Sequence, residues 1–266
     1  MLLQPQKKLD RINGEGLQHD SRLNAQGTFS GKFCAGNWVA LSLVMGITMG
    51  MRNSMKNLII IGASGFGREV AWLVERINQV QNTWKLLGFL DDNPALKDSF
   101  VNGYPVLGSV DRASEYKDCC FVCAIGASKV RKKIIQSLPE STEYATLIDP
   151  SAEMSAFVSV GKGSIICAHN LLTVNISIGN HVIINLDCTV GHDAVLGDFT
   201  TLYPSVNVSG ATTTGSCVEL GTGVQIIQGK TIGENTILGA GAVVVKDIPP
   251  NCTAVGSPAK PIKFFE

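Results

Sequence analysis

The most regular feature of the chain is an apolar residue that returns at every sixth position between residues 148 and 244. The chain keeps this register without an insertion, and Thr214 is the one polar member of the series. Glycine often follows the repeated residue, for example at Gly161, Gly179 and Gly191. The full series is Ile148, Met154, Val160, Ile166, Leu172, Ile178, Ile184, Val190, Leu196, Leu202, Val208, Thr214, Leu220, Ile226, Ile232, Leu238 and Val244.

A period of six fits neither an α-helix nor a plain alternating strand, whose side chains repeat every 3.6 and 2 residues. A chain that turns a corner every six residues places one side chain of each repeat inside a prism. Glycine then suits the corner, where a side chain is most costly. The spacing therefore predicts a parallel β-helix of hexapeptide repeats over residues 147–248, with about five to six coils, followed by a C-terminal tail over residues 249–266.

Residues 55–146 show a different pattern, in which short apolar runs alternate with helical periodicity. Alternating strands and helices of this kind predict a small Rossmann-like parallel α/β domain. The predicted elements are strands at Lys56–Ile61, Leu86–Leu90 and Cys120–Ile125, a glycine turn at Gly62–Gly67 with a helix behind it, and a basic helix at Lys129–Ser137.

Composition narrows the class of protein. The formal net charge is zero, which argues against bulk electrostatic attraction to nucleic acid or to an anionic membrane. The eight cysteines lack the regular spacing of a disulfide scaffold. Cys120 and Cys123 form a C-x-x-C pair within an apolar run, which favours a buried strand over a metal or redox site. We therefore expect a cytoplasmic protein with reduced thiols and no metal.

Residues 1–54 differ from the rest of the chain. They are polar and irregular at first, and then carry an apolar stretch from Trp38 to Met51. This stretch is shorter than the roughly 20 residues that span a bilayer, and it lacks a cleavage pattern. We expect a disordered or non-native extension, with Met55 as the natural beginning of the protein. An interfacial membrane anchor is the alternative.

Two segments of the α/β domain are candidates for binding a nucleotide. The turn Gly62–Gly67 precedes a helix, where backbone N–H groups bind phosphate well. Its glycines do not follow the G-x-G-x-x-G spacing, so an ordinary βα turn is equally compatible with it. Asp91 and Asp92 follow the second strand, where carboxylates bind ribose hydroxyls or base N–H groups. Ordinary turn chemistry is the alternative there.

Taken together, these residues resemble the NeuD/PglD-type sugar acyltransferases. This family comprises sialic acid O-acetyltransferases and N-acetyltransferases of nucleotide-linked amino sugars. The likeness lies in Ile61–Gly67, Phe89–Asn93, Ala124–Gly126 with Arg131–Lys133, Gly191-His192-Asp193 and the closing Gly256–Lys260. It implies a left-handed coil, a homotrimer, and acetyl-CoA held between neighbouring β-helices. It also implies a role in surface polysaccharide or glycan biosynthesis, and nucleotide-sugar contacts by Gly62, Ser64, Gly65, Asp91, Asp92 and Lys129.

The chain departs from this family at two positions. Some members carry a histidine in the glycine loop, where this chain has Phe66. Some also carry a second histidine nine residues after the catalytic one, where this chain has Thr201. Both departures concern the fit to a nucleotide-linked amino sugar.

Acetyl transfer to an amine or hydroxyl requires a base, and a histidine serves well at neutral pH because its ordinary pKa is about 6.5. The resemblance assigns this base to His192, with Asp193 orienting it. It also assigns the Gly210 backbone N–H to the oxyanion that develops on the thioester. Asn185 resembles a substrate contact, although a role at a β-helix corner is equally compatible with the sequence.

Coenzyme A is expected along the C-terminal coils. Gly239-Ala240-Gly241 leaves backbone accessible to the pantetheine arm, and Lys246 or Lys260 would meet the phosphates. Cys188 occupies an inward position of its repeat, so we expect a core residue rather than a covalent nucleophile. We therefore expect the acetyl group to pass directly from acetyl-CoA to the acceptor within a ternary complex, without a covalent enzyme intermediate.

Two alternatives remain at this point. A γ-type carbonic anhydrase is also a hexapeptide β-helix, but it needs three histidines that converge across a subunit interface. His169 and His181 share a place in the repeat, whereas His192 does not. The second alternative is a non-catalytic nucleotide-sugar-binding scaffold, against which the Gly191-His192-Asp193 motif argues.

Overall fold

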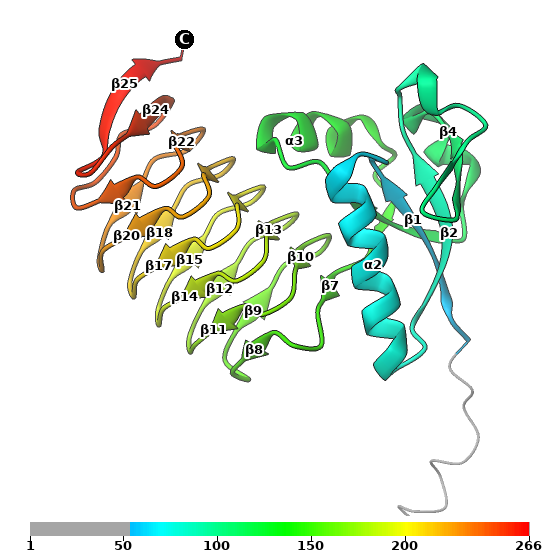
Figure 1. Cartoon of the computed structure of the whole chain (residues 1–266), viewed down its shortest axis with the longest axis horizontal. Helices are drawn as coiled ribbons and strands as arrows, with labels where there is room; N and C mark the ends of the chain where they lie inside the picture. Colours follow the sequence, from blue (N-terminus) through cyan, green and yellow to red (C-terminus); the bar gives the residue numbers. More distant parts are fainter. Residues whose placement is uncertain (1–53, 266) are drawn as a thin grey trace, which may run out of the picture. The chain divides into compact units, whose positions relative to one another are not determined.

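A computed structural model of the chain describes residues 54–265. All but the last residue of the predicted N-terminal extension, residues 1–53, and Glu266 lie outside the described residues. Within residues 54–265 an α/β domain precedes a long array of short strands (Figure 1). None of the helices in this range is long and apolar enough to cross a membrane.

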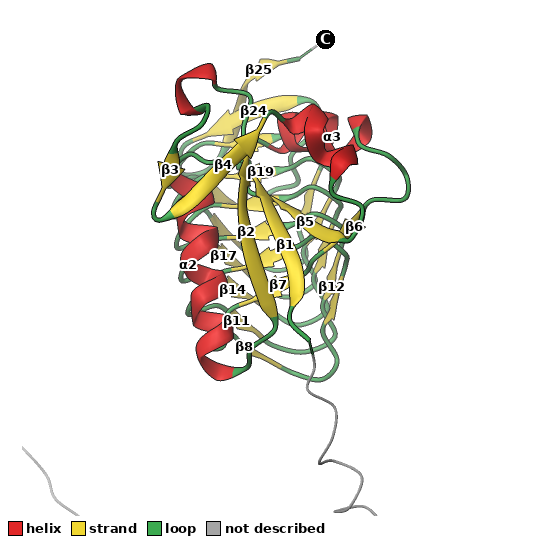
Figure 2. Cartoon of the chain, turned by 90° about the vertical axis from the view of Figure 1, so that its right-hand side faces the viewer, coloured by secondary structure: helices red, strands yellow, loops and turns green. Residues whose placement is uncertain are grey.

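The α/β domain is built on a six-stranded sheet with the order β3-β4-β2-β1-β5-β6. All neighbouring strands are parallel except the β3–β4 hairpin. Figure 2 views this sheet in front of the coils. The elements are β1 (Lys56–Ile61), α2 (Gly65–Val80), β2 (Trp84–Leu90), η1 (Pro94–Leu96), β3 (Phe100–Val101), β4 (Tyr104–Gly108), η2 (Val110–Glu115), β5 (Cys119–Cys123), α3 (Ser128–Ser137) and β6 (Glu143–Tyr144).

Strand β1 is apolar on both faces because helices cover the sheet on both sides. Leu58 and Ile60 pack with the buried side of α2, while Ile59 and Ile61 pack with residues of η2 and α3. Cys120 and Cys123 lie in β5 with buried side chains, which confirms the predicted buried strand. Burial raises the pKa of the Cys123 thiol to about 12.

The repeats form a three-sided prism whose sides we call sheets 1, 2 and 3, in the order in which the chain visits them. Each strand pairs in parallel with the strand one coil, or 18 residues, further on, as Ile183 pairs with Thr201. Sheet 1 contains β7 (Leu147–Ile148), β10 (Ile165–Ile166), β13 (Ile183–Ile184), β16 (Thr201–Leu202), β19 (Glu219–Leu220) and β22 (Ile237–Leu238). Sheet 2 contains β8 (Glu153–Met154), β11 (Leu171–Leu172), β14 (Thr189–Val190), β17 (Asn207–Val208), β20 (Gln225–Ile226) and β23 (Val243–Val244). Sheet 3 contains β9 (Ser159–Val160), β12 (Ser177–Ile178), β15 (Val195–Leu196), β18 (Thr213–Thr214) and β21 (Thr231–Ile232).

The six-residue apolar series fills the prism, as predicted. From Ile166 to Val244 its members are buried, and most of them belong to one continuous hydrophobic cluster. Thr214 also points inward, and its hydroxyl lies 3.2 Å from that of Thr200. Ile148, Met154 and Val160 are only partly buried, because the first coil has a neighbouring coil on one side alone.

The residues after the last repeat extend the prism. Strand β24 (Cys252–Val255) pairs in parallel with β22 and so continues sheet 1. Strand β25 (Lys260–Phe264) then pairs with β24 in antiparallel fashion. Cys252 and Ala254 belong to the core of the prism, so this hairpin covers its C-terminal end.

The α/β domain packs against the outer face of sheet 1. The outward side chains Leu147, Ile165 and Ile183 are buried in the same cluster as Leu58 and Ile60 of β1. Two polar contacts reinforce the junction at α3, where Glu219 of the β-helix accepts hydrogen bonds of 2.8 Å from the backbone N–H and the hydroxyl of Ser128.

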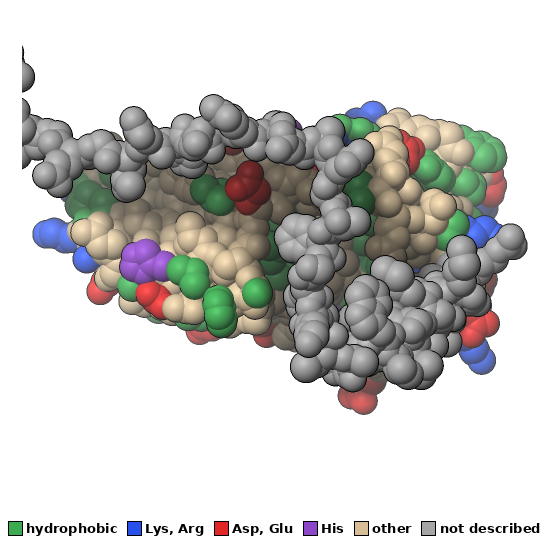
Figure 3. All heavy atoms as spheres, turned by 90° about the horizontal axis from the view of Figure 1, so that it is seen from below, with side chains coloured by type: hydrophobic (Ala, Val, Ile, Leu, Met, Phe, Trp, Pro, Cys, Tyr) green, Lys and Arg blue, Asp and Glu red, His purple; other side chains and the backbone are tan. Residues whose placement is uncertain are grey.

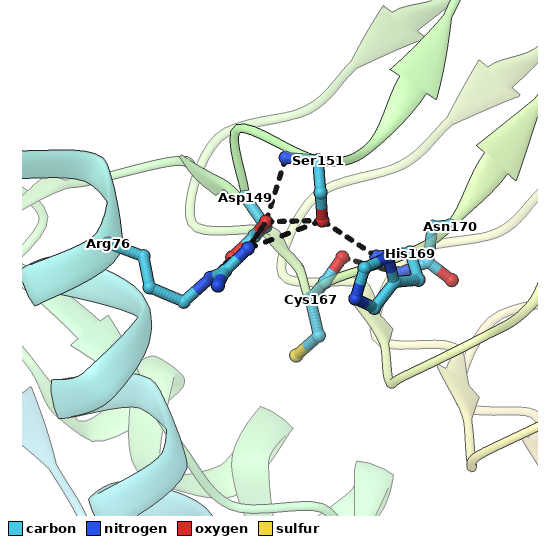
Figure 4. Close-up of polar contacts among 6 residues, drawn as sticks. All are labelled: Arg76, Asp149, Ser151, Cys167, His169 and Asn170. Carbon is cyan, nitrogen blue, oxygen red and sulfur yellow. Dashed lines mark hydrogen bonds and ion pairs between the residues drawn. The ribbon is translucent and has the colours of Figure 1, made fainter. Parts of the chain in front are cut away.

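A second polar junction ties α2 to the first coil (Figure 4). Arg76 donates to both carboxylate oxygens of Asp149, at 2.6 Å from Nε and 2.9 Å from Nη2. The hydroxyl of Ser151 donates to the same carboxylate at 2.7 Å and accepts from the His169 backbone N–H. Burial alone would raise the pKa of Asp149, but the hydrogen bonds from Arg76 and Ser151 outweigh it and lower the pKa to about 2.

Candidate active site

His192 lies at the corner between sheets 2 and 3, in the turn between β14 and β15. Its side chain is 64% exposed, and its Nδ1 lies 2.8 Å from Oδ2 of Asp193. The hydrogen bond with His192, followed by one from Asn175, lowers the pKa of the Asp193 carboxyl. An ionised carboxylate accepts the proton on Nδ1, which leaves Nε2 of a neutral imidazole free to act as a base.

Gly210 lies one coil beyond His192 at the same corner. A Cβ atom at this position would sit 2.5 Å from Nε2 of His192, so glycine lets the imidazole lie directly against the backbone. Among the hydrogen bonds of residues 54–265, none is donated by the Gly210 N–H. The corner thus combines an exposed histidine that is hydrogen-bonded on Nδ1 with a backbone donor, the Gly210 N–H, for which residues 54–265 supply no acceptor.

The same corner carries a column of residues at one-coil intervals, namely Val174, His192, Gly210, Gln228 and Lys246. Parallel strand pairing sets the interval between coils at about 4.8 Å. Lys246 therefore lies about 14 Å along the prism from His192, three coils away. The structure brings three of the predicted residues, His192, Gly210 and Lys246, onto one edge.

Apolar side chains are exposed beside this column. Phe157 is 72% exposed at the same corner, and Val174, Ile227 and Val245 are 37–38% exposed there. Val195 of sheet 3 is 42% exposed as well. Figure 3 shows a face of the β-helix on which hydrophobic side chains lie next to a histidine. Exposed apolar groups that gather in one place mark an interaction surface.

The other predicted residues of the coenzyme A site lie elsewhere. Gly239, Ala240 and Gly241 form the corner between sheets 1 and 2, between β22 and β23. Lys260 begins β25 of the terminal hairpin. Within one copy of the chain, the predicted coenzyme A residues are therefore divided between two corners of the prism and its end.

The predicted nucleotide residues come together at the carboxyl ends of β1 and β2. Asp91 accepts a 2.7 Å hydrogen bond from the Ala63 N–H on Oδ2, and so joins the glycine turn to the end of β2. A side chain at Gly67 would collide with the Gly62 carbonyl, so this glycine lets α2 pack closely on β1. Asp92 accepts from the Val110 N–H at 2.8 Å. The turn, both aspartates and the start of α2 form one polar site.

Two cavities flank Asp92. One of about 630 Å³ is lined also by Asp111, Val130 and Lys133, and one of about 460 Å³ by Asp91 and Arg112. The predicted contact Lys129 lines neither cavity, and its Nζ lies 4.6 Å from the ring centroid of Phe265 near the C-terminus. Sequence reasoning did not identify Lys133 or Arg112. The basic run that contains Lys133 was a signal, but no sequence pattern placed Arg112 near the aspartates.

The remaining candidates have structural partners. Asn185, at the corner between sheets 1 and 2, accepts from the Leu186 N–H at 2.8 Å. Phe66 packs against the hydrophobic core of the α/β domain. Thr201 is 1% exposed, accepts from Arg131 at 2.9 Å and donates to the Gly126 carbonyl at 2.8 Å. At both positions where the chain departs from the family, the side chain therefore has a structural contact. Phe66 packs within the α/β domain, and Thr201 joins that domain to the β-helix through its hydrogen bonds.

The three histidines of the described range occupy three different corners. His169 lies between sheets 1 and 2, His181 between sheets 3 and 1, and His192 between sheets 2 and 3. Within one copy of the chain they therefore do not gather at one place, and residues 54–265 contain no cluster of His, Cys, Asp or Glu suited to a metal ion. Cys188 is buried in the core, and burial raises the pKa of its thiol to about 11.

Comparisons with known proteins agree with this architecture. Residues 57–138 match the PglD N-terminal domain family. The GDP-perosamine N-acetyltransferase of Escherichia coli O157:H7 is 31% identical over 213 residues, which make up 77% of this chain and 95% of that protein.

Two solved structures show the same fold. The acetyltransferase domain of PglB from Neisseria gonorrhoeae, in complex with acetyl coenzyme A, has a TM-score of 0.72 and 32% identity, and the match covers 79% of this chain and 100% of that one. A histidine-to-asparagine variant of perosamine N-acetyltransferase from Caulobacter crescentus, with CoA and GDP-perosamine, has a TM-score of 0.71 and 29% identity, and the match covers 79% and 98%.

The fold and these likenesses define a hexapeptide-repeat acyltransferase with a left-handed β-helix. The chain belongs to the NeuD/PglD-type sugar acetyltransferase family. The predicted fold class, a Rossmann-like domain followed by a left-handed β-helix, is confirmed.

Proposed function

We propose that the protein transfers the acetyl group of acetyl-CoA to the amino group of a nucleotide-linked amino sugar in glycan biosynthesis, with His192 as the general base. The observation that carries this proposal is the His192–Asp193 pair, whose Nε2 has no hydrogen-bond partner within residues 54–265 and lies against the backbone of Gly210. Relatives named for GDP-perosamine favour an amine over a hydroxyl as the acceptor.

The geometry suits direct transfer. The acceptor amine attacks the thioester carbonyl carbon, and its N–H proton passes to Nε2 of His192 as the C–N bond forms. The Asp193 carboxylate stabilises the resulting imidazolium through Nδ1–H, and the Gly210 N–H donates to the developing oxyanion. The C–S bond then breaks, and the departing thiolate of coenzyme A takes up the proton and leaves as the thiol.

The column on the His192 edge also suits acetyl-CoA. The thioester would lie in the space beside Gly210, and the extended pantetheine arm would run along the prism past Gln228. Lys246, about 14 Å further along, would then meet the phosphates. At the other end of the acceptor, the N-terminus of α2 with Gly62, Ser64 and Gly65 would hold the nucleotide phosphates, and Asp91 and Asp92 its polar groups.

We further propose that the active form is a homotrimer in which two copies complete each site. In a three-sided prism, the corner between sheets 2 and 3 is opposite sheet 1, which the copy's own α/β domain covers. A nucleotide sugar on that domain is therefore on the wrong side for its own His192. The exposed apolar side chains beside His192 support a neighbouring copy at this corner.

The proposed location is the cytoplasm. Both substrates, acetyl-CoA and a nucleotide sugar, are made and used there. The seven cysteines of the described range are free thiols, which suits a reducing compartment.

The first test is acetyl-CoA turnover, measured as release of free thiol against a panel of acceptors. The panel contains GDP-, UDP- and dTDP-linked 4-amino sugars, together with sialic acid and CMP-sialic acid. Turnover on an amino sugar that is lost in His192→Ala supports the proposal. Turnover on sialic acid alone would make the enzyme an O-acetyltransferase. Binding of a nucleotide sugar without any turnover would favour the scaffold alternative.

The shared site has its own test. His192→Ala removes the base, and Gly65→Glu places a negative charge in the proposed phosphate site, where the backbone has room for a side chain. If neighbouring copies complete each site, co-expression of these two inactive variants restores part of the turnover. If each copy works alone, the mixture stays inactive.

A further inference from the structure

The carboxylate of Asp193 has a second partner from the preceding coil. One oxygen, Oδ2, contacts Nδ1 of His192 at 2.8 Å, and the other, Oδ1, accepts a hydrogen bond from Nδ2 of Asn175 at 3.3 Å. Asn175 and Asp193 occupy the same place at the corner between sheets 2 and 3, one coil apart. Asp193 thus lies between Asn175 and His192, and the imidazole of His192 lies against Gly210 of the next coil.

The backbone holds Asn175 and Asp193 in register. Asn175 and Asp193 share a left-handed conformation, with φ of 56° and 59°, and the Asp193 N–H donates to the Val174 carbonyl at 3.1 Å. Strand pairing of Leu172 with Val190 fixes the coils below this turn. Because the turns stack in this way, the backbone itself places the Asn175 amide opposite the Asp193 carboxylate.

We propose that Asn175 is a positioning residue for acetyl transfer: it fixes the plane and the ionised state of the Asp193 carboxylate, which in turn keeps the proton of His192 on Nδ1. This inference rests on the proposed function of His192 as the base. With one donor alone, an exposed carboxylate rotates freely about its terminal bond. A second donor on the other oxygen restricts that rotation and keeps Nε2 directed toward the ligand space.

Asn175 neither gives nor accepts a proton during the reaction. One proton moves from the acceptor amine to Nε2 of His192, the Nδ1 proton stays in place, and Asp193 stays ionised. The hydrogen bonds from His192 and then Asn175 lower the pKa of the Asp193 carboxyl. Removal of the Asn175 amide therefore raises the pKa of the Asp193 carboxyl, an effect that a residue with a merely structural role would not produce.

Two variants separate the amide from the backbone. Asn175→Gly removes the donor and keeps the left-handed conformation, which glycine adopts without strain. Asn175→Asp keeps the shape but sets a second carboxylate against Asp193. The matched controls are Asn235→Gly and Asn235→Asp, because Asn235 has a φ of 57° and donates to Asn251 at 2.9 Å at a different corner.

We expect Asn175→Gly to lower kcat about three- to tenfold and Asn175→Asp more than tenfold at pH 7, in the range of lost positioning contacts. KM for both substrates should change less than twofold. The pKa of the Asp193 carboxyl, measured by ¹³C NMR, should rise in both variants, and the Asn235 controls should match the parent enzyme. In ¹⁵N NMR of the free protein, the parent should show the Nδ1–H form of His192, and both Asn175 variants a mixture of tautomers.

Unchanged kcat, Asp193 pKa and His192 tautomer in both Asn175 variants would overturn the inference. An effect of equal size in the Asn235 controls would overturn it as well, because it would come from corner packing. If His192→Ala keeps full turnover, the proposed base is wrong, and that result is separate from the tautomer measured in the free protein.

Discussion

Two corners of the β-helix each carry a histidine, and the two side chains have opposite environments. His181, between sheets 3 and 1, is 3% exposed, stacks on Phe199 at 5.2 Å and meets the edge of Tyr144 at 4.6 Å. His192, between sheets 2 and 3, has a side chain that is 64% exposed and hydrogen-bonded on Nδ1. The first supports the junction of the domains, and the second is available for chemistry.

Arg131 shows the same contrast with the His192 corner. It is fully buried beside His181, and it donates to the carbonyls of Ile125, Gly126, His181 and Phe199 at 2.5–3.0 Å, and to Thr201. Burial lowers its pKa to about 10, so it remains a cation at neutral pH. All of these hydrogen bonds of the Arg131 guanidinium are made within the chain. At the His192 corner, by contrast, residues 54–265 supply no partner for Nε2 or the Gly210 N–H, and this difference separates a structural polar site from the proposed catalytic one.

The sharpest test of this comparison replaces each of the two histidines by alanine in a separate variant. His192→Ala should lower kcat by about 10²- to 10⁴-fold, the usual contribution of a general base, and leave the melting temperature unchanged. His181→Ala should instead lower the melting temperature by about 5 °C or more and leave kcat within a small factor. Thiol release and thermal unfolding measure the two effects. Loss of stability in the His192 variant would contradict the comparison.

The next effect concerns Arg131. Arg131→Met keeps most of the side-chain volume but leaves its buried acceptors without a donor, so we expect the free energy of unfolding to fall by about 3–5 kcal/mol. Urea unfolding measures it. Arg112→Met, at an exposed arginine paired with Glu115, is the control and should not change the unfolding curve measurably. A small effect at Arg131 would mean that packing and the other polar contacts join the domains without it.

The pH dependence of stability should follow His181. Burial, with the nearby cations Arg131 and Lys162, lowers its pKa from 6.5 to about 4 in the folded protein. Between these values the unfolded chain binds a proton that the folded chain does not, so stability is complete above pH 6.5 and decreases toward pH 4. The decrease is about 3 kcal/mol. Urea unfolding across this range should show it in the parent protein and not in His181→Phe.

The smallest effect concerns the contact between Gly210 and the imidazole ring of His192. Gly210→Ala should lower kcat about 10- to 100-fold, because the added methyl group would contact the movable ring of His192 and displace it. The fold should tolerate this change. In the control, Gly191→Ala, the methyl group would lie 2.6 Å from the backbone nitrogen of Gly210. That variant should lose stability. Equal stability of Gly210→Ala and Gly191→Ala would contradict the view that Gly210 serves the His192 site and Gly191 serves the fold.

The sequence was sufficient to predict the prism, because a six-residue period has few structural solutions. Its inward series, including Thr214, is the core of the β-helix. The strand at Lys56–Ile61 was also predicted with its bounds, since a short apolar run before a glycine turn has a clear beginning and end. The family was predicted from motifs because several short matches combined are more specific than each one alone.

Other features depended on contacts between residues far apart in the chain. No local pattern could show that Arg131 donates to carbonyls 50 or more residues away, or that Thr201 lies within that network. The predicted contact Lys129 reaches Phe265, whereas Lys133 lines a cavity with Asp92. The residues after the last repeat form a hairpin because β22 presents an unpaired edge to them.

The sequence by itself therefore determined the coil, its core and the family, because these depend on periodicity and on short motifs. Only the tertiary structure decided which corner of the prism each residue occupies. The period places His169, His181 and His192 at turns, but the α/β domain covers sheet 1 and leaves the corner opposite it exposed. Burial against that domain makes one histidine structural, and exposure at the opposite corner leaves another free to bind and react.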